Sequence, residues 1–366
     1  MLDSPGFLKP IEQFTASDLD AVRLILGGES VVDWRRLHLT TEQEARELLE
    51  SQEFQPDEPS DRARLDKIKS DAISYLRRHF DFPIPKPVEN ASIEELLLLA
   101  SSRGHRQICA CTILKAMHIV HHADGRELIF TLPMSLQDVF KLVEEKVYRV
   151  IGDMLASGFP ITEFVGGRKN KDSLYTKLLS KPETIAANVY DRLRFRIVTR
   201  TVDDILPTVA YLSKRVFPFT HVVPGQSMNT LFQLKSYLAQ YDALGPELAR
   251  TQMQLTDDMT HSGNVFSGST FRAIHFVADV PVRLPREVMV RAPSSVWALG
   301  PVVSILSEFQ IVDRETEAAN ELGDGSHTSY KARQKLAVMR RLKLGIADRP
   351  STSGSFPPTP PPPRVD

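Results

Sequence analysis

Two acidic residues lie in stretches with the partly alternating pattern of β-strands: Asp191 opens one such stretch and Glu308 lies within another. Carboxylates from two strands that converge at one edge of a sheet form a typical hard-cation site, and Mg²⁺ in such a site keeps phosphates and waters among its ligands. Cationic side chains accompany both acids along the chain. They are Arg192, Arg194 and Arg196 after Asp191, and Arg168, Lys169, Lys171 and Lys177 after a Gly-Gly pair. Guanidinium and ammonium groups beside a metal hold polyphosphates and neutralise developing charge, so this pattern predicts magnesium-dependent chemistry on a polyphosphate.

The elements that must position these residues fall into two regions with different sequence patterns. Up to about residue 155 the apolar spacing is helical, with helices predicted over 61–79, 93–101, 107–121 and 135–156. Thr41 with Glu44, and Ser92, read as helix caps. After Gly158, strands are predicted over 194–199, 271–277 and 302–311, with helices over 201–216 and 315–323. The predicted fold class is α+β: an N-terminal all-helical region followed by a mixed β-sheet domain flanked by helices.

Composition divides the chain further. The predicted units are residues 1–82, an N-terminal helical segment; 88–157, a helical domain; and 158–335, the sheet domain with an insertion at about 226–269. Residues 347–366 are rich in proline, serine and threonine, which predicts a disordered or polyproline II tail.

Bulk properties exclude several classes. The formal net charge is −1, so an electropositive site must be local, and no run of about 20 apolar residues predicts a membrane span. The N-terminus has none of the features of a signal peptide. The two cysteines, Cys109 and Cys111, are too close for a useful disulfide and favour a reducing compartment. We therefore expect a cytoplasmic protein.

Together, the charged segments resemble the synthetase domain of the RelA/SpoT family, the (p)ppGpp synthetases, which is nucleotidyltransferase-like. The matching segments are Gly167-Arg168-Lys169 with Ser173-Leu174-Tyr175-Thr176-Lys177, Asp191 to Arg196, Phe271 to His275, Glu308-Phe309-Gln310-Ile311, and Glu321 to Lys331. The N-terminal half does not resemble the family's HD hydrolase domain, because His121-His122-Ala123-Asp124 lacks its separate histidine and adjacent His-Asp ligands.

The resemblance implies an ATP:nucleotide 3′-diphosphotransferase that moves pyrophosphate from ATP to the 3′-hydroxyl of GDP or GTP. It implies that the catalytic residues Asp191 and Glu308 bind Mg²⁺, or that Glu308 accepts the proton of the attacking hydroxyl. The implied nucleotide-binding residues are Arg168, Lys169, Lys171, Ser173, Lys177, Arg196, Phe271, His275 and Gln310. Phe271 stands where the family has a tyrosine that stacks on the acceptor base, and Phe keeps the ring but loses the hydroxyl.

Departures from the family pattern fall mainly on the acceptor side, where Pro224-Gly225 is followed by Gln226-Ser227-Met228-Asn229 instead of Arg-Phe-Lys-Asp-Tyr. Two alternatives therefore stay open: pyrophosphate transfer to a tRNA 3′ end, and a catalytically lapsed relative that senses nucleotides or binds a partner. The expected partners are ATP and a guanine nucleotide, with an RNA 3′ end and a second copy of the chain left open and no membrane.

A zinc site built from His118, His121 and His122 with Cys109 and Cys111 is a further candidate. We set it aside, because the two cysteines point to different faces of the predicted helix and buried cysteines are common core residues. The only cofactor that the sequence predicts is Mg²⁺.

Overall fold

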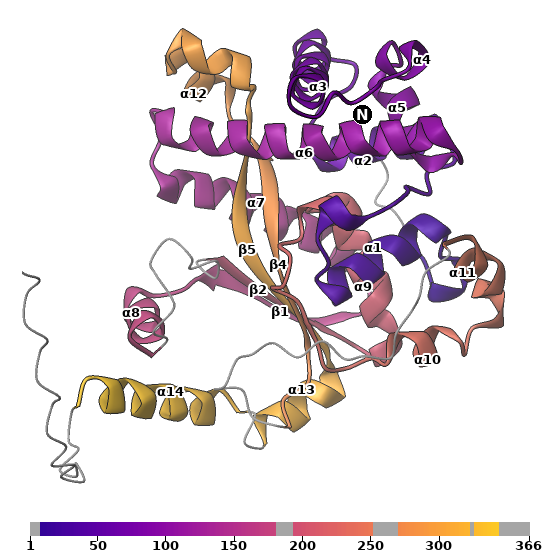
Figure 1. Cartoon of the computed structure of the whole chain (residues 1–366). Helices are drawn as coiled ribbons and strands as arrows, with labels where there is room; N and C mark the ends of the chain where they lie inside the picture. The colour runs from indigo at the N-terminus through magenta and orange to yellow at the C-terminus, as the bar shows by residue number, and fades with distance from the viewer. Residues whose placement is uncertain (1–7, 181–192, 252–269, 323–325, 344–366) are drawn as a thin grey trace, which may run out of the picture.

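The computed structural model describes residues 8–180, 193–251, 270–322 and 326–343 (Figure 1). Asp191 and the predicted tail at 347–366 lie outside these residues. The helices before the sheet are α1 (Ala16–Gly27), α2 (Glu42–Ser51), α3 (Pro59–Phe80), α4 (Lys86–Glu89), α5 (Ile93–Ser101), α6 (His105–Thr131) and α7 (Leu136–Ala156). The strands are β1 (Ile161–Arg168), β2 (Leu193–Thr199), β3 (Met228–Asn229), β4 (Ile274–Arg283) and β5 (Val302–Asp313). The later helices are α8 (Lys171–Ser180), α9 (Ile205–Arg215), α10 (Leu234–Leu238), α11 (Gly245–Thr251), α12 (Arg286–Arg291), α13 (Arg314–Glu321) and α14 (His327–Arg341).

The helices predicted from apolar spacing are present, and the two predicted caps mark where α2 and α5 begin. Thr41 accepts a hydrogen bond from the Glu44 backbone, whose side chain bonds back to the Thr41 backbone, and Ser92 forms the same capping box with Glu95. Such boxes satisfy N–H groups that have no partner within the helix. The predicted fold class is confirmed: helices precede a mixed sheet in an α+β arrangement.

The sheet has five strands in the order β1-β2-β5-β4-β3. β2 pairs in parallel with β5, whereas β1 with β2, β4 with β5 and β3 with β4 pair antiparallel. β1 was not predicted as a strand. Its last residues, Gly167 and Arg168, pair with Arg194 and Leu193 of β2.

The two faces of the sheet differ. On one face Phe195, Phe276 and Phe309 pack ring against ring with Phe217, which follows α9. Apolar side chains of α1, α7 and α9 complete this core. The other face carries charged and polar residues of β2, β4 and β5, so the sheet is apolar where helices cover it and polar where the candidate site lies.

A second apolar cluster forms among α2, α3, α5 and the first half of α6, from Trp34 to Met117. α6 passes from this cluster into the sheet core, where Leu128 is buried. In Figure 1, α6 runs across the upper ends of β4 and β5, with α3 and α5 above it. How these two clusters divide the chain into folding units stays a prediction.

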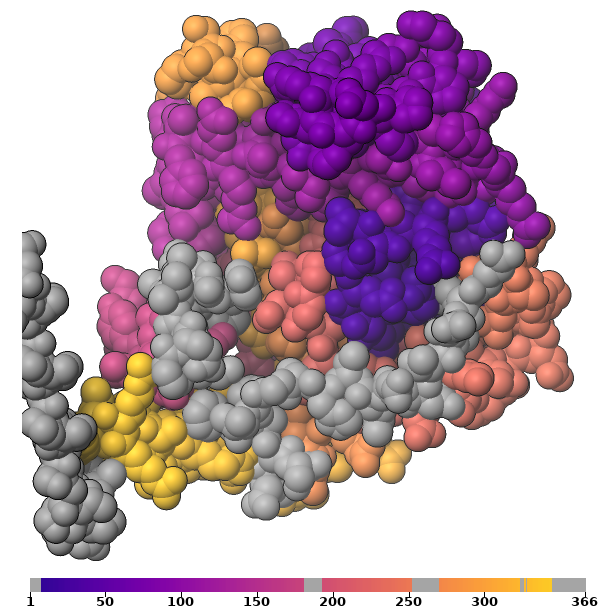
Figure 2. Space-filling view, in the orientation of Figure 1, coloured from indigo at the N-terminus to yellow at the C-terminus, as the bar shows by residue number. Residues whose placement is uncertain are grey.

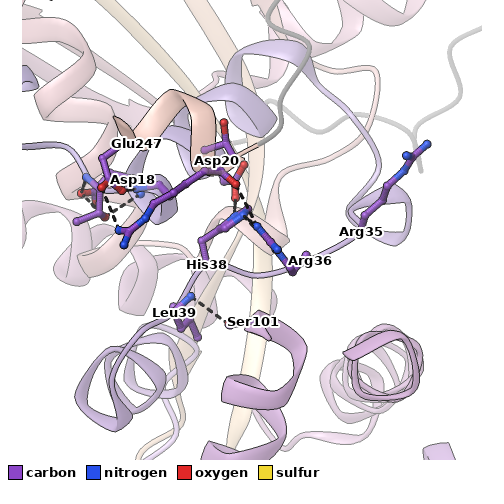
Figure 3. A network of polar contacts seen from close by, with 12 residues as sticks. Asp18, Asp20, Arg35, Arg36, His38, Leu39, Ser101 and Glu247 are labelled. Atoms are coloured by element: carbon purple, nitrogen blue, oxygen red, sulfur yellow. Dashed lines mark hydrogen bonds and ion pairs between the residues drawn. The ribbon is translucent and has the colours of Figure 1, made fainter. Parts of the chain in front are cut away.

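Polar contacts tie the first helix to both clusters (Figure 3). His38 donates through Nδ1 to Asp20 of α1, and its Nε2 accepts from Arg36 at 2.8 Å. Arg36 also donates to the Arg250 carbonyl at 3.0 Å, and Glu247 accepts from the Ala16 backbone at 2.9 Å. α1 is therefore held against α11, and Figure 2 shows it (indigo) lodged between the helices above it and the α10–α11 segment. None of the helices in the described ranges is long and apolar enough for a membrane span.

Candidate active site

The register of the sheet brings the predicted polar residues together. Arg194 lies opposite Glu308 and Arg196 opposite Gln310 in the parallel β2–β5 ladder, while His275 of β4 lies opposite Gln310. Because residues opposite one another in a ladder project to the same face, these five side chains share the polar face of the sheet.

Glu308 is at the centre of this group. Its side chain is 13% exposed, and its Oε1 lies 3.0 Å from His275 Nε2 and 3.6 Å from Arg194 Nε. Burial alone raises the pKa of a carboxyl group, but His275, Arg194 and Lys169 together lower the pKa of Glu308 to about 2. Glu308 is therefore a carboxylate at neutral pH, and so acidic a group is a weak proton acceptor.

Gln310 fixes the direction of Arg194. The buried Gln310 amide oxygen accepts from the Arg194 guanidinium at 2.5 Å, so the same guanidinium is held within reach of Glu308. Gln310 thus acts on Glu308 through Arg194.

Arg196 has different partners from Arg194. It forms an ion pair with Glu317 of α13 and a second with Glu163 Oε1 at 2.9 Å. Arg196, which was predicted to bind a nucleotide, thus joins α13 to β1 and β2, and two carboxylates neutralise its charge.

Arg168 is directed to the opposite side of the sheet from Glu308. Its guanidinium contacts both Glu144 oxygens of α7, at 2.9 and 2.7 Å, and Gln137 Oε1 at 2.5 Å. It also lies over the Phe140 ring, 5.8 Å from the centroid. The bidentate pair anchors the end of β1 to α7.

The remaining predicted cations lie on or just before α8. Lys169 is near enough to Glu308 to lower the pKa of that carboxyl. Lys171 is the first residue of α8, and Asn170 accepts a hydrogen bond from the Ser173 backbone at 2.8 Å. Lys177 is in the last turn, where Ser180 and the carbonyl groups of Leu178 and Leu179 bond to Gln334 and Arg341 of α14. The α8–α14 contact therefore sets where this cationic helix lies (Figure 1).

Phe271 lies three residues before β4, outside the strand that was predicted to begin there, and is half-buried. The next residue, Arg272, exchanges two backbone hydrogen bonds with the Asn320 side chain, at 2.9 and 2.8 Å. Thr230 Oγ1 accepts from the Ala273 backbone at 2.9 Å. These contacts fix the backbone that carries the predicted stacking ring.

Sequence reasoning named Arg194 only within the cationic group after Asp191, and assigned no role to Asn320 or Thr230. The alternation of Arg194 with Leu193 and Phe195 was a usable signal, because it places Arg194 on the polar face. Asn320 and Thr230 act on a segment about 40 to 50 residues away in the chain, which no local pattern reveals.

Of the two carboxylates predicted to bind a hard divalent cation, the structure describes one, Glu308. Glu308 is an ionised carboxylate on the polar face, which is the ligand type that Mg²⁺ prefers. The second carboxylate that the sequence predicts, Asp191, lies outside the described residues. Glu308 would therefore supply one protein oxygen, with the others coming from Asp191, substrate phosphates and water.

No family model matches the chain, and no curated protein matches it. Among solved structures, it is similar to the small alarmone synthetase 1 of Bacillus subtilis, with 16% identity over 61% of this chain and 88% of that chain and a TM-score of 0.28. It is also similar to the small alarmone synthetase 2 of Bacillus subtilis (14%, 57% and 89%, TM-score 0.27). A GTP pyrophosphokinase family protein from Streptococcus pneumoniae matches with 16% identity over 58% of this chain and 90% of that chain, with a TM-score of 0.29. Values this low establish no shared activity.

Proposed function

We propose that the chain is a magnesium-dependent pyrophosphokinase that transfers pyrophosphate from ATP to the 3′-hydroxyl of GDP or GTP. The observation that carries the proposal is the ionised Glu308, held by His275 and Arg194 on a polar sheet face and near enough to Lys169, just before α8, for that lysine to lower its pKa. In this reaction the 3′-oxygen forms a bond to the β-phosphorus, the bond from that phosphorus to the α,β-bridging oxygen breaks, AMP leaves, and the hydroxyl proton is released.

The residues divide this work between charge and orientation. Bound Mg²⁺ would neutralise phosphate charge, held by Glu308 and by Asp191, the ligand that the sequence resemblance implies. Because the pKa of Glu308 is about 2, we assign it to electrostatics and metal binding over proton acceptance. Lys169, Lys171 and Lys177 would bind the ATP phosphates, Ser173 and Arg196 would complete that side, and Phe271 would stack on the acceptor base.

The test is a turnover assay with γ-labelled ATP, Mg²⁺ and one acceptor at a time: GDP, GTP, ADP, ATP or deacylated tRNA. A labelled guanine nucleotide that E308Q and D191N fail to form would support the proposal. A labelled tRNA end alone would replace it with the RNA-directed alternative.

A second candidate function is nucleotide sensing without turnover. The observation that favours it is that Arg168 and Arg196 are both neutralised by carboxylates of the chain itself. Calorimetric binding of ATP with no product from any acceptor would establish this candidate and refute the pyrophosphokinase.

A further inference from the structure

Three histidines from two distant parts of the chain converge where α6 crosses β4. His118 and His122 belong to α6, and His221 ends the short 3₁₀ helix η5 (Phe219–His221). One nitrogen of each lies within 4.8 Å of the others. The ring centroid of His122 is 4.3 Å from that of His118 and 4.5 Å from that of His221.

The spacing along α6 suits a metal. His118 and His122 are four residues apart, so their side chains leave the same face of the helix one turn from each other. Two histidines at this spacing on a helix are a common half-site for zinc, and the third ligand then comes from elsewhere in the fold. Here His221 takes that place.

Asp279 of β4 orients two of the rings. Its Oδ2 lies 3.2 Å from His122 Nδ1, and its backbone carbonyl accepts from His221 Nδ1 at 3.0 Å. His221 therefore donates from Nδ1 and presents the lone pair of Nε2, and the Asp279 carboxylate beside His122 Nδ1 favours the same arrangement in that ring. A ligating histidine that donates its other N–H to a carboxylate or a carbonyl is the usual arrangement around protein-bound metals.

The two Nε2 atoms have no hydrogen-bond partner among the residues that the structure describes. His122 Nε2 and His221 Nε2 are buried without a hydrogen bond, and His221 is 3% exposed. A buried polar atom left without a partner costs about 1–3 kcal/mol. Two such atoms beside a third imidazole therefore require an explanation, such as a bound ligand.

We propose that His118, His122 and His221 bind one zinc ion that joins α6 to the sheet domain. Zinc–nitrogen distances of about 2.0–2.1 Å place tetrahedral ligands about 3.4 Å apart, so binding draws the rings together by at most about 1.4 Å. Three imidazoles leave the fourth position to water, and the unpartnered Oδ1 of Asp279 is a buried acceptor next to the site. Asp279 also supplies a negative charge against the ion, which Arg126, 3.9 Å from Oδ2, partly offsets.

The cysteines that the sequence placed beside these histidines are not part of the group. Cys109 and Cys111 are buried and free, and their sulfur atoms contact Pro83, His105, Gln107 and backbone carbonyls. His121 is outside the group: its ring packs on Phe54 at 5.0 Å between centroids, and its centroid is 6.2 Å from that of His122. The site is thus a three-histidine site whose third member is about 100 residues from the first two.

The test uses the full chain, stripped with a chelator and titrated with zinc chloride against a chromophoric competitor. We expect one zinc per chain and a higher Tm in its presence. H221Q and H122Q should each weaken zinc binding by more than about 100-fold, beyond the 10–100-fold typical of losing a partner of a ligand. H121Q is the matched control on the same helix and should bind within about threefold of the unaltered chain.

Cobalt bound to the unaltered chain gives a second measurement, which does not depend on whether any variant folds. Three imidazoles and a water give visible d–d absorption of a four-coordinate ion without a thiolate-to-cobalt charge-transfer band. The proposal is overturned by the absence of stoichiometric zinc, by an H221Q chain that binds like the original, or by a thiolate charge-transfer band.

Discussion

The polar group around Glu308 and the histidine group at His221 both lie against β4, four residues apart at His275 and Asp279, yet they differ in how charge is handled. Around Glu308 the carboxylate is contacted by Arg194 of β2 and His275 of β4, and Lys169, before α8, helps to lower its pKa. Around His221, burial lowers the pKa of His118 and of His221, and two imidazole nitrogens have no hydrogen-bond partner among the described residues. A carboxylate that is paired with side chains can exchange those partners for a metal ion or a substrate. Nitrogen lone pairs that converge without partners are suited to bind a cation. The first therefore suits catalysis and the second suits permanent metal binding.

The largest effect should separate the two groups by activity. E308Q keeps the shape of the side chain but removes its charge, and losing one preorganised electrostatic contact typically lowers kcat by about 10²–10³-fold. Zinc content should not change. Steady-state kinetics and metal analysis on the same preparation check both points. An active E308Q enzyme would remove Glu308 from the chemistry.

Acid should act on the Glu308 group through stability. The pKa of Glu308 falls from 4.5 to about 2 on folding, so its contribution is fully present above pH 4.5 and is lost as the pH falls toward 2. A shift of this size corresponds to about 3 kcal/mol, as an order of magnitude. Denaturant unfolding from pH 6 to pH 2 should show a smaller loss of the free energy of unfolding in E308Q than in the original chain. Parallel curves for the two proteins would contradict the assigned pKa.

Asp279 sharpens the comparison from the histidine side. D279N weakens the acceptor of His122 Nδ1–H, and we expect about a 10–100-fold loss of zinc affinity. Turnover should change by less than about tenfold, because Asp279 touches none of the five polar-face residues at Glu308. Competitive zinc titration and the transfer assay measure the two quantities. Equal losses in both would merge the two groups into one site.

The smallest expected effect concerns Arg168. E144Q weakens a partly exposed ion pair, so the free energy of unfolding should fall by less than about 1 kcal/mol. If Arg168 binds ATP, as the sequence resemblance implies, freeing it from Glu144 should lower KM for ATP. R168A in the same assay is the control and should raise KM. An unchanged KM in both variants would leave Arg168 with the structural contact to α7 alone.

Much of the helical part was predictable because its signals are local. The Thr41–Glu44 and Ser92–Glu95 capping boxes are complete within four residues, and the apolar spacing of α7 repeats over its whole length. β1 was missed although its residues 161–165 are rich in β-branched and aromatic types, because the Gly-Gly pair after them has little strand preference and extends the strand only by pairing with β2. Gly166 fits there because a Cβ would come within 2.9 Å of the Phe195 ring.

For the candidate site, the sequence alone determined which residue types are present and which alternate on a strand: Arg194 with Arg196, and Glu308 with Gln310. Only the tertiary structure decided that the parallel β2–β5 register puts Arg194 opposite Glu308, and that Arg168 faces α7. It also decided that His221, and not a cysteine, joins His118 and His122. The physical reason is range: caps and periodicity are set by neighbours along the chain, whereas register and convergence are set by packing between segments that the sequence keeps far apart.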